Sequence, residues 1–81
     1  MSMLTPIDTA LARRAVDALL ERYVAWREEC ETVWLAYQRW VDADRHEHWL
    51  AHAGYVAALD REERAARSYA DHIERVRLIS P

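Results

Sequence analysis

Residues 16–40 read VDALLERYVAWREECETVWLAYQRW. Bulky apolar residues recur in this stretch at alternating intervals of three and four, which brings them to one side of an α-helix. Charged and small residues fill most of the positions between them. The pattern predicts a long amphipathic helix with a coiled-coil seam made of Val16, Leu19, Tyr23, Trp26, Cys30, Val33, Tyr37 and Trp40.

The composition predicts an all-α protein. The chain has 81 residues with a single Gly, and its two Pro stand at positions 6 and 81, so little of the sequence favours strands or tight turns. A chain of this length buries a smaller share of its surface than a large domain does. We therefore expect one domain over residues 1–81, with frayed ends at residues 1–4 and 79–81.

The first helix has a clear start signal. Thr5 can cap it, Pro6 suits the first turn, and Asp8 favours the positive end of the helix dipole. Neither Gly nor Pro follows until position 54. The sequence predicts this helix over about 6–42.

A break is expected just after it. Asp44, with Glu47 three residues later, resembles a capping pattern and predicts a second helix over about 45–78. The expected fold is a long antiparallel helical hairpin. Two alternatives are a single rod that continues through residues 42–47 and a third helix that begins at Asp60.

The second helix carries its own three-four pattern. Folding the chain back at residues 44–45 lays this pattern on the first and pairs Trp26 with Glu63 and Tyr37 with His52. Buried polar groups need hydrogen-bond partners, so Glu63, His52 and Tyr37 are expected to be buried and bonded. A functional carboxylate is the alternative for Glu63. The pattern consists of Trp49, His52, Val56, Leu59, Glu63, Ala66, Ala70, Ile73 and Arg77.

Each helix also carries a second apolar stripe, which two helices alone cannot cover. A two-fold dimer that forms a four-helix bundle is the simplest way to bury it, and a tetramer is the alternative. Trp34 has no counterpart on the second helix and is the ring expected to contact a second copy or another protein. The expected interface contains Leu20, Cys30, Trp34, Val41, Tyr55 and Tyr69.

Three histidines at the start of the second helix are candidate metal ligands. His48 and His52 are four residues apart and share a helix face, while His46 and Glu47 lie beside them, a set that suits Zn²⁺ or another divalent transition metal. Two histidines are only half of a tetrahedral site. The structural interpretation, with His52 bonded to Tyr37 and no cofactor, is the simpler one.

Cys30 is the only cysteine, so no internal disulfide is expected. A small buried hydrophobe is its simplest role, since the sequence implies no base beside it. A dimer axis that passes near Cys30 is the alternative.

The charge balance argues against a protein that coats nucleic acid. Eleven basic residues face fourteen acidic ones, for a net charge of −3. Arginines cluster in the last third of the chain but alternate with acidic residues there. They are Arg61, Arg64, Arg67, Arg75 and Arg77.

The sequence shows no leader pattern, and no apolar run approaches the roughly 20 residues that a membrane helix needs. We therefore expect a cytoplasmic protein without membrane contact.

These observations predict a small self-associating helical module for interaction or structure, with no catalytic activity. The first alternative is a metal-binding helical bundle. The second is a nucleic-acid-associated regulator.

Overall fold

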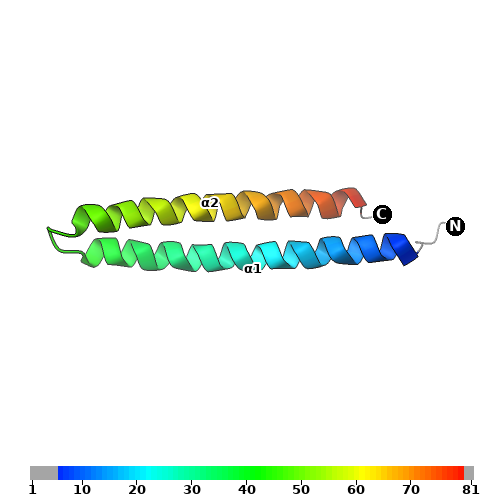
Figure 1. The fold of residues 1–81 in the computed structure, drawn as a ribbon, viewed down its shortest axis with the longest axis horizontal. Coiled ribbons are helices and arrows are strands. Elements are labelled where there is room, and N and C mark those ends of the chain that lie inside the picture. Colours follow the sequence, from blue (N-terminus) through cyan, green and yellow to red (C-terminus); the bar gives the residue numbers. More distant parts are fainter. Residues whose placement is uncertain (1–5, 80–81) are drawn as a thin grey trace.

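The computed structural model describes residues 6–79 as two long antiparallel helices joined by one turn (Figure 1). Helix α1 spans Pro6–Asp42 and helix α2 spans His48–Ile79. The predicted all-α hairpin is therefore confirmed. The helix cap predicted at Thr5 lies outside the described residues, as do residues 1–4, 80 and 81 of the ends predicted to fray. Ile79, also predicted to fray, is the last residue of α2.

The turn forms where Asp44 predicts it. The side-chain Oδ1 of Asp44 accepts hydrogen bonds from the backbone N–H groups of His46 and Glu47, each at 3.0 Å. Glu47 N–H also donates to the Asp44 carbonyl at 3.2 Å, and Ala51 N–H donates to the Glu47 carbonyl at 2.9 Å. Residues 45–47 are thus a turn, and α2 begins three residues later than predicted.

Helix α2 then runs without a break through Asp60, so the alternative of a third helix is wrong. The alternative of a single rod is wrong as well, because the chain reverses at residues 43–47. The resulting hairpin is narrow, with principal extents of 68 × 14 × 14 Å.

The two helices meet along a narrow seam, defined here as the least exposed positions on each helix. Only Ala58 is fully buried among the described residues, with 0% of its surface exposed, and the other seam residues are half-buried. The positions recur at intervals of three and four, or seven. They are Ala15, Leu19, Trp26, Glu29, Val33, Ala36 and Trp40 on α1, and Ala51, Tyr55, Ala58, Glu62, Ala65, Tyr69, His72 and Val76 on α2.

Two aromatic stacks hold the seam together. Trp26 lies on Tyr69 with ring centroids 5.6 Å apart and an interplanar angle of 15°. Trp40 lies on Tyr55 at 5.3 Å and 21°. The two Trp residues are two heptads apart, and so are the two Tyr residues, so an antiparallel pairing brings both stacks into place together.

The predicted seam on α1 is half right: Leu19, Trp26, Val33 and Trp40 lie in the seam, whereas Val16, Tyr23 and Tyr37 are exposed. The predicted seam on α2 is wrong by one residue. The structure turns Tyr55, Ala58, Glu62 and Tyr69 toward α1, whereas the predicted residues follow these by one position and are mostly exposed. One residue corresponds to a rotation of about 100° around a helix. The small residues Ala51, Ala58 and Ala65 allow close approach, and the rings between them stack, which favours this rotation.

Candidate interaction face

A broad apolar face lies on one side of the hairpin. It is made of the residues that follow the seam by one position, and in an antiparallel pair these residues fall on the same side of both helices. All are exposed or half-buried. On α1 this apolar face contains Val16, Leu20, Tyr23, Arg27, Cys30, Trp34, Tyr37 and Val41. On α2 it contains Trp49, His52, Val56, Leu59, Glu63, Ala66, Ala70, Ile73 and Arg77.

Apart from the imidazole of His52, Arg27 and Glu63 are the charged side chains in the central part of this face, and Arg77 is a further one at its open end. The opposite side, one position before the seam, is far more polar. It carries Arg14, Glu21, Glu28, Arg39 and Asp42 on α1, Glu47 in the turn, and Arg61, Arg64, Asp71 and Arg75 on α2. Contiguous exposed apolar surface of this kind is typical of an interaction site.

Three predicted interface residues lie on the apolar face and are exposed. Trp34 is the largest of the three, with 57% of its surface exposed, and its ring stacks on Tyr37 at 6.0 Å and 21°. Leu20 lies seven residues before Arg27, and Val41 lies seven residues after Trp34. Arg27 and Trp34 are themselves seven apart, so all four residues form one row along α1. Cys30 is half-buried at the edge of this face and is a free thiol.

Two predicted interface residues have a different role. Tyr55 and Tyr69 pack between the helices, where they stack on Trp40 and Trp26. The prediction that they form an outer stripe is therefore wrong. On α2, the stripe predicted to form the interface packs in the seam, and the stripe predicted to form the seam lies on the apolar face. The cause is the rotation of the helix by one residue.

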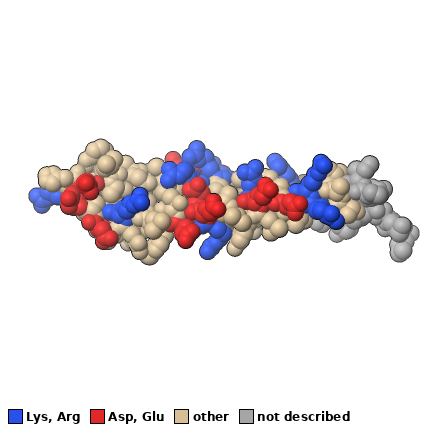
Figure 2. Space-filling view, turned by 60° about the horizontal axis from the view of Figure 1, so that its bottom comes forward, with Lys and Arg blue, Asp and Glu red and all other residues tan. Residues whose placement is uncertain are grey.

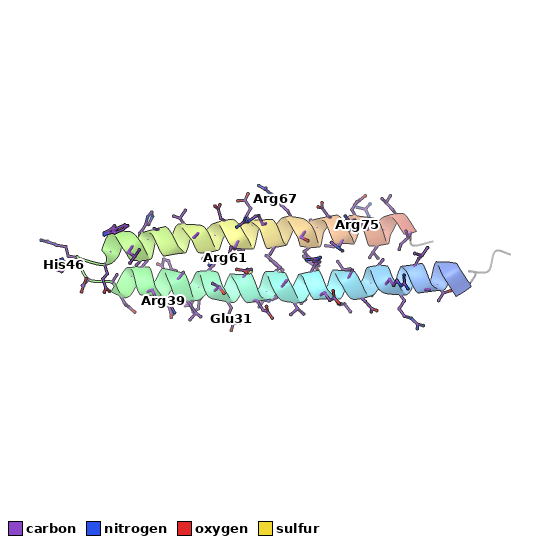
Figure 3. All side chains as sticks on the ribbon, viewed as in Figure 1. Glu31, Arg39, His46, Arg61, Arg67 and Arg75 are labelled. Carbon is purple, nitrogen blue, oxygen red and sulfur yellow. The ribbon has the colours of Figure 1, made fainter. Side chains whose placement is uncertain are left out.

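The carboxylate that contacts Trp26 is Glu62, not Glu63. Trp26 Nε1–H donates to Glu62 Oε1 at 3.2 Å. Glu63 is exposed and forms an ion pair at 2.6 Å with Arg67, which lies on the side of α2 away from α1 (Figure 3). The prediction of a buried Glu63 is wrong for this hairpin. A signal for Glu62 was present in its spacing of seven residues from both Tyr55 and Tyr69.

Tyr37 and His52 are also exposed, which corrects the prediction that both are buried and bonded to each other. Tyr37 packs beside Tyr55 at 5.8 Å. His52 lies against the ring of Trp40 at 4.7 Å in a T-shaped contact. The described residues contain no hydrogen bond between Tyr37 and His52, because α2 turns His52 toward Trp40 instead.

The candidate metal ligands divide into two groups. His48 Nε2 accepts a hydrogen bond from Trp40 Nε1–H at 3.1 Å, so His48 and His52 both contact Trp40. His46 lies in the turn and projects beyond the end of the hairpin (Figure 3). The described residues contain no cluster of three or more His, Cys, Asp or Glu that could hold a metal ion, and Glu47 joins none. Metal binding stays a prediction.

The clustered arginines of α2 mostly have partners. Arg61 Nε lies 3.5 Å from Glu29 Oε2 on α1, Arg67 pairs with Glu63, and Arg77 pairs with Glu74 at 3.3 Å. Acidic and basic side chains alternate along the face drawn in Figure 2. This arrangement offers no support for the nucleic-acid alternative, which stays a prediction.

Among the described residues, neither helix is long and apolar enough to cross a membrane. Comparison of the chain with protein-family models, with curated proteins and with solved structures gives no match. The apolar face is therefore the feature from which a function can be argued.

Proposed function

We propose that this protein is a small self-associating interaction module in which two hairpins join their apolar faces to form a four-helix bundle. In this proposal the chain has no catalytic activity of its own. Further protein partners would dock on the outside of the bundle.

The accessible surface of the hairpin supports the proposal. It amounts to 6779 Å² for a 9.5 kDa chain, whereas a compact monomer of this mass exposes about 5,000 Å². The excess of roughly a third arises because two helices can bury only one narrow stripe each. A second hairpin is the simplest way to cover the second stripe.

The size of the apolar face also fits. A rectangle with the 68 and 14 Å extents of the hairpin covers about 950 Å², close to the ~800 Å² that each partner buries in a standard stable interface. The part of this face nearer the turn is rich in Trp and Tyr, side chains that dominate the binding energy of many interfaces.

Sedimentation of the parent chain and of two matched variants tests the proposal. Trp34 and Leu35 are adjacent and similarly exposed, at 57% and 52%, but only Trp34 lies on the apolar face. We expect the parent chain to sediment as a dimer at micromolar concentration. Trp34→Glu should weaken association by about a hundredfold or more, because it buries an unpaired carboxylate, while Leu35→Glu should leave association unchanged.

Helix content measured by circular dichroism should stay similar in both variants, which separates dissociation from misfolding. A well-folded parent chain that sediments as a monomer at micromolar concentration would overturn the proposal. A tetrameric mass would keep the apolar face as an interface but would change the stoichiometry.

A further inference from the structure

We infer that the two hairpins pair with their turns at the same end, so that Arg27 of each copy faces Glu63 of the other. This inference rests on the proposed self-association and adds the orientation and register of the two copies. It is carried by Arg27 and Glu63, the two formal charges in the central part of the apolar face.

Arg27 and Glu63 lie at nearly the same height along the hairpin. Trp26 bonds to Glu62, and Glu29 pairs with Arg61, so the residues beside them are level across the two helices. Both charges also occupy heptad rows of the apolar face. Arg27 lies midway between Leu20 and Trp34, and Glu63 lies midway between Val56 and Ala70.

A second copy can be placed on the apolar face by two kinds of two-fold axis. An axis parallel to the helices lays α1 of one copy over α2 of the other at equal heights, with both turns at the same end. An axis perpendicular to the helices lays α1 on α1 and α2 on α2, with the turns at opposite ends. Both operations bury the same surface.

Charge favours the parallel axis. It places Arg27 of each copy opposite Glu63 of the other and forms two symmetric ion pairs. The perpendicular axis, at full overlap, brings Glu63 close to Glu63 of the second copy and Arg27 close to Arg27. Buried like charges oppose association, which makes this pairing the less stable one. Both groups can form the new ion pair. In the hairpin Arg67 binds only Oε1 of Glu63, and Arg27 has no ion pair among the described residues.

Side-chain volume favours the same axis. At equal heights, Tyr23 of one copy faces Ala66 of the other and Leu20 faces Ala70, so large residues meet small ones. The perpendicular axis, in the register that brings Arg27 to Arg27, sets Leu20 against Trp34, so that two large residues meet. Interfaces reach native packing density when large and small residues alternate.

One pair of like charges remains at the open end of the hairpin. The next positions in the two rows are Arg13 and Arg77, both exposed, and Arg77 pairs with Glu74 in its own chain. Such solvated charges interact weakly. This contact therefore leaves the preference for the parallel axis in place.

A spin-label distance tests the orientation directly. Arg45 is an exposed turn residue, so Arg45→Cys in a Cys30→Ala background carries one nitroxide per chain at the end of the hairpin. We expect electron–electron double resonance to give a distance of about 15–30 Å, since the two turns are then separated by one helix-packing distance plus the label arms. The perpendicular axis predicts a distance close to the 68 Å length of the hairpin.

Sedimentation of the same labelled sample separates the two hypotheses. A long distance in a dimeric sample overturns the orientation and leaves self-association intact. A monomeric sample without any intermolecular distance overturns both.

Charge reversal in the parent background is an independent test. Arg27→Glu and Glu63→Arg should each weaken association by about tenfold, because each turns two attractions into two repulsions. The double variant should recover to within about threefold of the parent. Arg14→Glu, which makes the same charge change on the opposite side, is the control and should have no effect. Unchanged association in both single variants would contradict the inference, because the perpendicular axis pairs each charge with its own kind in parent and variant alike.

Discussion

The carboxylate of Asp44 fixes where the chain reverses. Its Oδ1 accepts two backbone N–H groups that the start of a helix would otherwise leave without acceptors. No Gly is present in the turn, and no described residue has a positive φ. Many turns reverse the chain by means of a Gly with positive φ, whereas here the side-chain hydrogen bonds of Asp44 stabilise the reversal.

Replacing Asp44 by Ala should destabilise the hairpin by about 1 kcal/mol, the usual cost of losing a capping side chain. Asp44→Asn retains an acceptor oxygen at the same place and should stay within a few tenths of a kcal/mol of the parent chain. Urea unfolding followed by circular dichroism gives both values. Equal stability of the Ala variant and the parent would show that the two hydrogen bonds contribute nothing.

Glu62 shows where reasoning from single residues fails. Glu62 and Glu63 are adjacent and chemically identical, so residue type alone does not indicate which one contacts Trp26. The rotation of α2 decides it, and rotation is a property of the helix pair. A Trp indole bonded to a Glu was predictable, but the choice of Glu was not. A spacing of seven links Glu62 to Tyr55 and Tyr69, and it links Glu63 equally to Val56 and Ala70.

At the scale of the element, α2 has two apolar stripes side by side. One contains Tyr55, Tyr69 and Val76, and the other contains Val56, Leu59 and Ile73. Each stripe obeys the three-four spacing equally well, so periodicity alone cannot rank them. Stacking of Tyr55 and Tyr69 on two Trp rings selects the first stripe for contact with α1.

This choice predicts unequal effects for two neighbouring alanines. Ala58 is fully buried in the seam, whereas Ala57 is exposed on the opposite side. Ala58→Leu should destabilise the hairpin by about 1–3 kcal/mol, because the added side chain forces the helices apart. Ala57→Leu should change stability by less than about 0.5 kcal/mol.

Thermal or urea unfolding measures the difference between these two variants. Leu has a helix propensity close to that of Ala, so both substitutions affect the isolated helix alike. If Ala57→Leu proved the more destabilising of the two, the rotation of α2 described here would be incorrect.

At the scale of the whole molecule, the hairpin has little interior. A single described residue is fully buried, and many large apolar side chains remain exposed. Chains of this size rarely reach useful stability from one small core. In the proposed bundle the apolar face of each hairpin becomes interior, so that folding and association contribute to the same stability.

The thermal midpoint should therefore rise with protein concentration. Each tenfold increase stabilises a dimer by about 1.4 kcal/mol, which corresponds to several degrees for a chain of this length. Scanning calorimetry or circular dichroism over a hundredfold concentration range measures this shift. Trp34→Glu should reduce it strongly. A midpoint that stays constant across the range would contradict coupled folding and association.

The sequence by itself determined the helices, their approximate ends and the turn. Heptad spacing, the near absence of Gly and Pro, and Asp44 act locally, within a few residues along the chain. It also showed that each helix has more apolar surface than one seam can bury. Only the tertiary structure decided which stripe of α2 meets α1, and with it the roles of Tyr55, Glu62 and Tyr69. The reason is physical: spacing fixes which residues share a side of a helix, whereas the rotation of that helix follows from how its side chains pack against the other.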